Sequence, residues 1–325
     1  MILAAGYGTR LRPVTFTLPK PMVPVCNRPL IAYAVEALKN AGVDELVVNL
    51  HHLPEAIEKY LHDTYASDLD IHFSLEPEIL GTGGGVRKVR HLLERDPDFL
   101  LVNADTIQFP DWQSLRRARA DRDALAALTL RHPPQGDKFT AVYFDDGLIT
   151  GFGKGHGEPL MFSGSHCISS RIFRYIPEKD FSGIVDEGYG PAIANAKEKL
   201  AGFVDDGLWF DIGTANRYIS ASQGMLEAMT SGRIAVPARS VVRGTSLLHE
   251  TAHAKKSIER STVGARSVVE GEVRDSYIWD DCRIAAGARL QSCIVAHGVN
   301  IVDKIELRDS LIVADGGDGL TLVPL

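Results

Sequence analysis

Short apolar runs alternate with amphipathic stretches through the first two thirds of the chain. Strand-like apolar runs lie at 45–50, 70–75, 98–103 and 124–130, and apolar residues recur at helical spacing in 30–42, 54–63 and 84–95. Strands that alternate with helices indicate a mostly parallel sheet with helices on both faces. We therefore expect an α/β fold, in which residues 2–5, 30–41 and 45–50 form the first β-α-β unit.

The pattern changes twice further along the chain. Asp146 and Gly147 separate two strand-like runs within 139–152, which predicts a hairpin, and helical segments are expected at 169–176 and 190–199. From 261 to 313, aliphatic residues recur about every six positions, often followed by Gly or Ala, which indicates a parallel β-helix of a few coils. We expect a first domain over 1–232 and a second, of degenerate hexapeptide repeats, over 233–325.

Composition agrees with a two-domain soluble protein and narrows its partners. The 325 residues are 45% hydrophobic and 24% charged, and no stretch approaches the roughly 18 apolar residues that span a bilayer. A net charge of −7 argues against a general affinity for nucleic acid. The four cysteines form no C-x-x-C pair and residues 2–5 are too short for a signal peptide, so we expect reduced thiols and a cytoplasmic location.

The opening segment carries the first candidate chemistry. Gly6 and Gly8 follow the first strand, and Arg10, Arg12 and Lys20 come directly after them. Glycines let backbone N–H groups approach an oxyanion, cations offer charge to phosphate oxygens, and ligands of α/β folds bind beyond the carboxyl ends of strands. This pattern indicates a phosphate site. Leu11 breaks the dinucleotide G-x-G-x-x-G fingerprint, and the surroundings of Lys154 do not form a Walker loop.

The whole opening resembles a known signature. "LAAGYGTRLRPVT" followed by "LPKPMVPVCNRPLI" is similar to the signature of sugar-1-phosphate nucleotidyltransferases, L-A-[AG]-G-x-G-[TS]-R-[LM]-x-P-x-[TS] and then P-K-P. The resemblance implies an enzyme that makes an NDP-sugar and pyrophosphate from an NTP and a sugar 1-phosphate. It also implies a Rossmann-like, mostly parallel mixed sheet, the nucleotide-diphospho-sugar transferase fold, here with a short C-terminal left-handed parallel β-helix.

The resemblance also implies roles for residues of the opening and of "ILGTGGGVR" (79–87). Arg10 and Lys20 would be catalytic, because they would contact the triphosphate and the charge of the transition state. The implied nucleotide-binding residues are Leu3, Ala4, Ala5, Gly6, Gly8, Thr9, Gly81, Thr82 and Gly83. Taken alone, the second glycine stretch is equally well explained by a tight turn.

Two aspartates follow apolar strands, Asp105 in "LLVNADT" and Asp211 in "LWFDIGT". In the family such residues bind Mg²⁺, an ion that needs only one or two carboxylates when substrate phosphates supply further oxygens. Either one alone could instead be a helix cap or a turn residue.

The sugar would lie against Ser163 and Gly164 in "PLMFSGSHCIS", for which a glycine bulge in a buried strand is the alternative. The family's E-K-P motif is missing here, and Glu158 is the nearest substitute for its sugar-binding glutamate.

The sequence leaves the substrates open. Within the family, mannose guanylyltransferases more often carry a C-terminal β-helix, so the resemblance favours GTP and mannose 1-phosphate. UTP with N-acetylmuramate 1-phosphate, or another hexose or heptose 1-phosphate, is the alternative. A non-catalytic regulatory subunit that binds a nucleotide sugar is the rival from another class. Such a subunit would be expected to lack Lys20 or one of the two metal-binding aspartates, but Lys20, Asp105 and Asp211 are all present. We also expect a homo-oligomer.

Overall fold

The computed structural model describes residues 1–134, 136, 138–194, 198–302, 304–316 and 319–325. The chain divides into two compact units. The first unit holds Met1–Tyr7 and Ile31–Trp209, and the second holds Gly8–Leu30 and Phe210–Leu325. The boundary predicted at 232–233 lies inside the second unit, which groups part of the opening segment with the C-terminal third of the chain. The functional division at that boundary stays a prediction.

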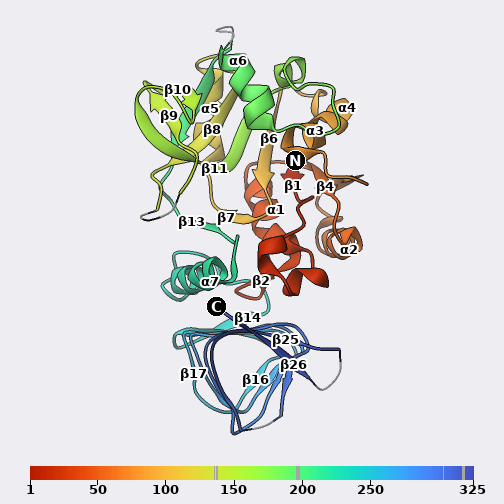
Figure 1. Cartoon of the computed structure of the whole chain (residues 1–325), viewed down its shortest axis with the longest axis vertical. Coiled ribbons are helices and arrows are strands. Elements are labelled where there is room, and N and C mark those ends of the chain that lie inside the picture. The colour runs from red at the N-terminus through yellow and green to blue at the C-terminus, as the bar shows by residue number, and fades with distance from the viewer. Residues whose placement is uncertain (135, 137, 195–197, 303, 317–318) are drawn as a thin grey trace. The chain divides into compact units, whose positions relative to one another are not determined.

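A nine-stranded mixed sheet forms the centre of the first unit, in the order β5-β4-β1-β6-β11-β8-β12-β10-β9 (Figure 1). Its strands are β1 (Ile2–Leu3), β4 (Glu45–Leu50), β5 (Asp70–Leu75), β6 (Asp98–Asn103), β8 (Ala126–Arg131), β9 (Val142–Asp145), β10 (Leu148–Phe152), β11 (Glu158–Ser169) and β12 (Leu200–Val204). Strands β5, β4, β1 and β6 are parallel, whereas β11 runs antiparallel to β6 and β8. The predicted α/β architecture is confirmed, with a sheet that is mixed.

Local sequence explains where several elements begin and end. Helix α1 (Leu30–Asn40) starts directly after Pro29 and stops before Gly42, whose φ of 79° is the left-handed conformation that ends many helices. The turn between β9 and β10 has φ of 44° at Asp146 and 77° at Gly147, as a two-residue hairpin turn requires. The predicted helix start and the predicted hairpin are therefore both present.

The other helices of this unit are α2 (Pro54–Tyr65), α3 (Gly81–Lys88), α4 (Arg90–Leu93), α5 (Trp112–Ala120) and α6 (Gly190–Ala194). The expectation of one helix over 84–95 is wrong in two respects, because α3 already begins at Gly81 and a break separates it from α4. A 3-10 helix, Ser170–Arg174, replaces the helix expected at 169–176. Of the helix expected at 190–199, α6 covers the first part, and 195–197 lie outside the described residues.

In the second unit, parallel strands recur in successive coils, which we call the C-terminal coils (Figure 1). They comprise β14 (Ser240–Arg243), β15 (Ser246–His249), β16 (His253–Ala254), β17 (Ile258–Glu259), β18 (Thr262–Val263), β19 (Val268–Val269), β20 (Glu272–Arg274), β21 (Tyr277–Ile278), β22 (Arg283–Ile284), β23 (Arg289–Val295), β24 (Asn300–Ile301), β25 (Glu306–Ala314) and β26 (Leu320–Pro324). The same unit contains β2 (Pro24–Val25), β3 (Arg28–Pro29) and α7 (Ala215–Thr230). The parallel strands expected in this region are thus present.

The coils bury one aliphatic side chain on each side of a turn, in register from turn to turn. Leu248 pairs with Val263 fifteen positions on, and Ile278 pairs with Val295 seventeen positions on. These residues belong to one buried apolar cluster. Each turn passes through three rows of strands. A turn of fifteen residues therefore has about five residues in each row, slightly fewer than the six expected from the sequence.

A ladder of buried serines also runs through the coils. The backbone N–H of Ser261 donates to Ser246 Oγ at 3.2 Å, and that of Ser276 donates to Ser261 Oγ at 3.0 Å. The N–H of Cys293 then donates to Ser276 Oγ at 3.0 Å. Buried N–H groups need partners, so each serine hydroxyl fixes the register of the next turn.

Replacing Ser276 by alanine tests this ladder. The change removes the acceptor of the buried Cys293 N–H and the donor to the Arg274 carbonyl oxygen, which lies 2.7 Å from Ser276 Oγ. We expect a loss of about 1–3 kcal/mol in the free energy of unfolding, measured by urea denaturation. Ser310→Ala is the matched control, since Ser310 is half-buried and its hydroxyl donates to Arg308 O. Equal losses in the two variants would contradict the role given to the ladder.

The cysteines are unbridged and buried, in keeping with the reduced thiols expected from their spacing. Burial raises the pKa of the Cys26 thiol to about 12, so this side chain is a packing residue. Among the described residues, we find no helix that combines the length and the apolar character needed to cross a membrane.

Candidate active site

The backbone that follows β1 lies between the ends of two neighbouring strands. Leu3 O accepts a hydrogen bond from Ala104 N at 3.0 Å, and Ala4 N donates to Asn49 Oδ1 at 2.8 Å. Asn49 is the last residue but one of strand β4, and Ala104 directly follows β6. The predicted nucleotide-binding segment Leu3–Ala5 is therefore at the carboxyl edge of the parallel strands, where ligands of such sheets bind.

A buried Asn–Glu pair connects this segment to helix α3. Asn49 Nδ2 donates to Glu76 Oε1 at 2.8 Å, and Glu76 Oε2 accepts from Leu80 N at 3.0 Å. A Cβ on Gly85 would lie 2.8 Å from Glu76 Oε1 and 2.9 Å from Asn49 Nδ2, so only glycine lets α3 approach the pair. Sequence reasoning missed both polar residues, although an asparagine inside an apolar strand was an available signal.

The predicted nucleotide-binding residues Gly81, Thr82 and Gly83 form the first turn of α3 and pack against the segment around Ser182. Gly83 N donates to Ser182 O at 2.8 Å, and Thr82 Oγ1 accepts from Ile184 N at 2.9 Å. Gly81 has φ of 74°, and a Cβ there would lie 2.5 Å from Ser182 O. These contacts give a packing reason for the glycines, and nucleotide binding at 81–83 stays a prediction.

The predicted sugar-binding turn and Asp105 lie at the same end of β6. Ser165 of β11 pairs with Val102 of β6, and the pairing of β11 with β8 shifts register beside Ser163 and Gly164. Gly164 has φ of 105°, and a Cβ there would lie 3.0 Å from Nδ2 of Asn103, two residues before Asp105. Trp209 Nε1 donates to Ser163 O at 2.8 Å and fixes the turn from its other side.

Glu158 is not brought to this turn. It is the first residue of β11, six residues before Gly164, which lies in the middle of that strand. Its carboxylate Oε1 contacts His132 Nε2 at 3.1 Å, and Asp206 Oδ2 contacts His132 Nδ1 at 2.7 Å. The hydrogen bond to Asp206, followed by that to Glu158, raises the pKa of His132. A sugar-binding role for Glu158 stays a prediction without support from this arrangement.

In the second unit, Gly8 brings the opening loop against Lys20. Gly8 has φ of 63°, and a Cβ there would lie 2.9 Å from Lys20 Cβ. Thr15 Oγ1 donates to Gly8 O at 2.8 Å and closes the loop. Lys20 is only 8% exposed, so its stem is packed. A side chain at position 8 would be strained and would displace Lys20.

The side chains of Arg10 and Asp211 both lie next to Gly213. A Cβ on Gly213 would lie 2.8 Å from Arg10 Nη1 and 3.1 Å from Asp211 Oδ2. The carboxylate of Asp211 also forms an ion pair with Arg217 on α7. The second unit therefore joins one predicted catalytic cation to one predicted metal ligand. Arg12, by contrast, is exposed and lies over the Phe16 ring, with its guanidinium carbon 4.9 Å from the ring centroid.

The carboxylates of Asp105 and Asp211 are suitable ligands for a hard divalent cation that has few protein ligands. In the ranges that the structure describes, no group of three or more His, Cys, Asp and Glu could hold a metal ion. Asp105 and Asp211 offer carboxylate oxygens, which Mg²⁺ accepts together with phosphate oxygens and water. Asp211 is paired with Arg217, so a bound cation would share this carboxylate with the guanidinium or displace it.

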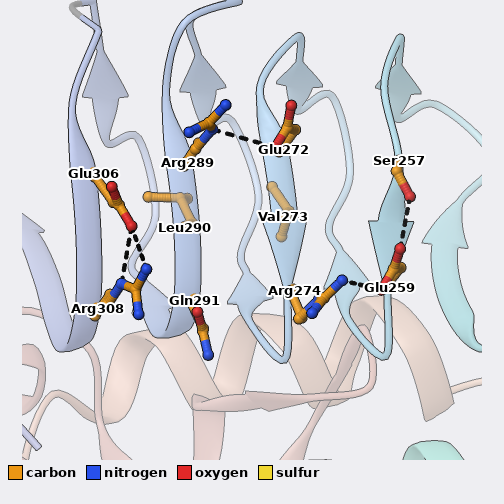
Figure 2. A pocket seen from close by; sticks show the side chains of 10 residues that line it. All are labelled: Ser257, Glu259, Glu272, Val273, Arg274, Arg289, Leu290, Gln291, Glu306 and Arg308. Carbon is orange, nitrogen blue, oxygen red and sulfur yellow. Dashed lines mark hydrogen bonds and ion pairs between the residues drawn. The ribbon is translucent and has the colours of Figure 1, made fainter.

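A separate pocket lies on one face of the C-terminal coils and was not predicted (Figure 2). Three arginines line it, and each has an acidic partner, in the pairs Arg274–Glu259, Arg289–Glu272 and Arg308–Glu306. Because each arginine is already paired, the pocket offers little net attraction to an anionic substrate.

The chain is similar to known nucleotidyltransferases. The model of the nucleotidyl transferase family matches residues 1–228. A mannose-1-phosphate guanyltransferase of Hypocrea jecorina is 27% identical over 327 residues, which cover 96% of this chain and 85% of the relative. A UTP–glucose-1-phosphate uridylyltransferase of Synechocystis is 27% identical over 343 residues, covering 94% of this chain and 86% of the relative.

The fold is similar to that of solved structures. HddC from Yersinia pseudotuberculosis, complexed with GMP-PN, superposes with a TM-score of 0.58 at 22% identity, covering 69% of this chain and 97% of that one.

Proposed function

Because the chain belongs to the nucleotidyl transferase family and is a sugar-1-phosphate nucleotidyltransferase, we propose that its substrates are GTP and mannose 1-phosphate. The observation that carries this choice is the match to a mannose-1-phosphate guanyltransferase over 96% of the chain, the C-terminal coils included. UTP with a hexose 1-phosphate is the second candidate, supported by the match to a UTP–glucose-1-phosphate uridylyltransferase.

The proposed reaction is an in-line displacement. An oxygen of the sugar 1-phosphate attacks the α-phosphorus of the nucleoside triphosphate, the bond from that phosphorus to the bridging oxygen breaks, and pyrophosphate leaves. The attacking oxygen is already an anion, so no general base is required. Arg10 and Lys20 are proposed to offset negative charge on the phosphate oxygens, an effect that grows as charge builds in the transition state.

We assign a divalent cation, proposed to be Mg²⁺, to Asp105 and Asp211. When bound, such an ion neutralises phosphate charge and orients the triphosphate for displacement. The place of Asp105 just after the end of β6 supports this assignment, whereas Asp211 would have to share its carboxylate between the ion and Arg217, with which it forms an ion pair.

For the nucleotide, we propose contacts with the backbone of Leu3, Ala4, Ala5, Gly6, Gly8 and Thr9, and with Gly81–Gly83. The hydrogen bonds of Leu3 and Ala4 to neighbouring strand ends support a fixed backbone at the start of this segment. We propose that the sugar lies against Ser163 and Gly164, supported by their position beside the end of β6.

We propose that the C-terminal coils form a left-handed parallel β-helix and that the protein is a cytoplasmic homo-oligomer. Three rows of parallel strands and one shared apolar cluster support the first point. Buried, unbridged cysteines support a reducing compartment.

Gly164→Ala tests the sugar-binding turn. The φ of 105° and the closeness of Asn103 leave little room for a methyl group, so the turn must shift. We expect the KM for the sugar phosphate to rise about tenfold while the KM for the NTP is unchanged. Gly153→Ala is the matched control, because Gly153 also has a positive φ, 69°, but its Cβ would meet only Thr140 Cγ2 at 4.0 Å. A parallel rise in both KM values would contradict the assignment.

The substrates themselves are tested by measuring pyrophosphate release with Mg²⁺, crossing the common NTPs with hexose, aminosugar and heptose 1-phosphates. The highest kcat/KM is expected for GTP with mannose 1-phosphate. A clear preference for UTP with a glucose or N-acetylmuramate phosphate would replace the proposed substrates by the alternative.

A further inference from the structure

The segment that follows Lys20 turns back on itself at a strained position. Cys26 and Asn27 have φ of 49° and 61° and form the turn between β2 and β3. A two-residue hairpin turn requires this conformation at both positions, and asparagine adopts it readily, but it is costly for Cys26, so the surroundings must hold that residue. We call Lys20–Asn27 the lysine segment.

Two backbone hydrogen bonds connect this turn to Lys20. Val23 N donates to Lys20 O at 3.1 Å and closes the 3-10 helix Lys20–Met22. Leu30 N donates to Val23 O at 3.0 Å, across the base of the turn. A displacement of the turn would therefore displace the backbone of Lys20.

The C-terminal coils hold the turn through a buried chain of two hydrogen bonds. Trp279, which follows β21, donates its Nε1–H to Tyr218 Oη at 2.8 Å. Tyr218, on α7, donates its hydroxyl to Pro24 O at 2.7 Å. Tyr218 and Trp279 are 2% and 3% exposed, so water does not replace these bonds easily.

Further contacts come from neighbouring parts of the same unit. Asn27 Nδ2 donates to Val263 O at 3.1 Å and to Ser240 Oγ at 3.4 Å, both on the coils. Cys26 Sγ lies 3.6 Å from Ser222 O of α7. Thus each residue of the strained turn contacts α7 or the coils.

We propose that the C-terminal coils position Lys20 for nucleotidyl transfer, with Trp279 and Tyr218 as the positioning residues. This inference rests on the proposed function of Lys20. It gives the coils an indirect part in the reaction, because loss of the indole N–H or of the phenol hydroxyl frees the Pro24 end of the lysine segment. Both residues act through the lysine segment.

Trp279→Phe and Tyr218→Phe test the inference, since each keeps an aromatic ring and removes one polar group. We expect faster backbone amide exchange across the lysine segment, measured by mass spectrometry without substrate. We also expect kcat to fall about tenfold in both variants while the KM values stay within about twofold, because a misplaced catalytic group costs turnover more than binding. The double variant should lose little more than either single variant, since both act through one chain of bonds.

Trp112→Phe is the matched control. Trp112 is 5% exposed, lies on α5 of the other unit, and its Nε1 has no hydrogen-bond partner among the described residues. It should change neither exchange in the lysine segment nor kcat. Melting temperatures check folding. If Tyr218→Phe does not fold, Asn27→Ala serves as the second variant, because it removes the contacts with Val263 and Ser240 from a half-buried position.

Unchanged exchange in folded Trp279→Phe would overturn the inference, and so would a wild-type kcat despite faster exchange. A wild-type protein without pyrophosphate release on any substrate pair would instead overturn the proposed function, while the exchange measurement would still decide whether the coils hold the segment.

Discussion

Lys20→Ala is expected to lower kcat by about 10²–10³-fold, the cost of removing one preorganised charged or hydrogen-bonding group that stabilises a transition state. The lysine is held for such a role, because its stem is buried and its Cβ lies against the position where Gly8 lacks a side chain. The KM for the NTP should rise less than kcat falls, since the charge that Lys20 meets is greatest at the moment of displacement. Steady-state pyrophosphate release gives both constants.

Arg12→Ala provides the control for a lost cation in the same loop. Arg12 is exposed and its guanidinium contacts the Phe16 ring, so we expect a change in kcat of less than about threefold. Near-normal turnover in Lys20→Ala, or an equal loss in both variants, would remove Lys20 from the mechanism.

Asp105→Asn is expected to lower kcat by a similarly large factor, because it weakens the binding of the divalent cation. The amide nearly preserves the size of the side chain but removes the negative charge that a divalent cation needs, at a cost of several kcal/mol, or about 10³-fold in kcat. The Mg²⁺ concentration for half-maximal rate should also rise. Asp211→Asn should behave in the same way, although loss of its ion pair with Arg217 adds a structural effect.

Asp96→Asn is the control for a lost carboxylate, because Asp96 is exposed in the turn before β6. It should leave the Mg²⁺ dependence unchanged. A normal Mg²⁺ titration in Asp105→Asn, whatever its kcat, would show that this carboxylate does not hold the ion.

Sequence pattern identified the elements whose cause is local. The apolar run of β4, the Pro29 and Gly42 that bound α1, and the Asp146–Gly147 turn all follow from side-chain or backbone preferences within a few residues. The start of α3 could not be predicted in this way. Glycine is a poor helix former, and what makes Gly81–Gly85 helical is packing against Ser182 and the Asn49–Glu76 pair, which are remote in sequence.

The candidate site, like the fold, contains some residues that the sequence could identify and others that depend on remote contacts. The opening signature named Arg10 and Lys20 as candidates, and the same family resemblance named Asp105 and Asp211 at two later strand ends. The structure places Arg10 and Asp211 beside Gly213. The resemblance also named Ser163 and Gly164, which lie beside the end of β6, and Glu158, which does not. The contact of Tyr218 with Pro24 depends on a fold that joins residues 194 positions apart, and nothing local in either stretch indicates it.

The central claim is sugar-1-phosphate nucleotidyl transfer, and product analysis of the wild-type protein tests it most directly. With Mg²⁺, GTP and mannose 1-phosphate, ³¹P NMR should show a nucleoside-diphosphate sugar and pyrophosphate appearing in equal amounts, with no product when the sugar phosphate is omitted. Release of orthophosphate, pyrophosphate formation that does not depend on any sugar phosphate, or no turnover with any NTP and sugar 1-phosphate pair would contradict the account.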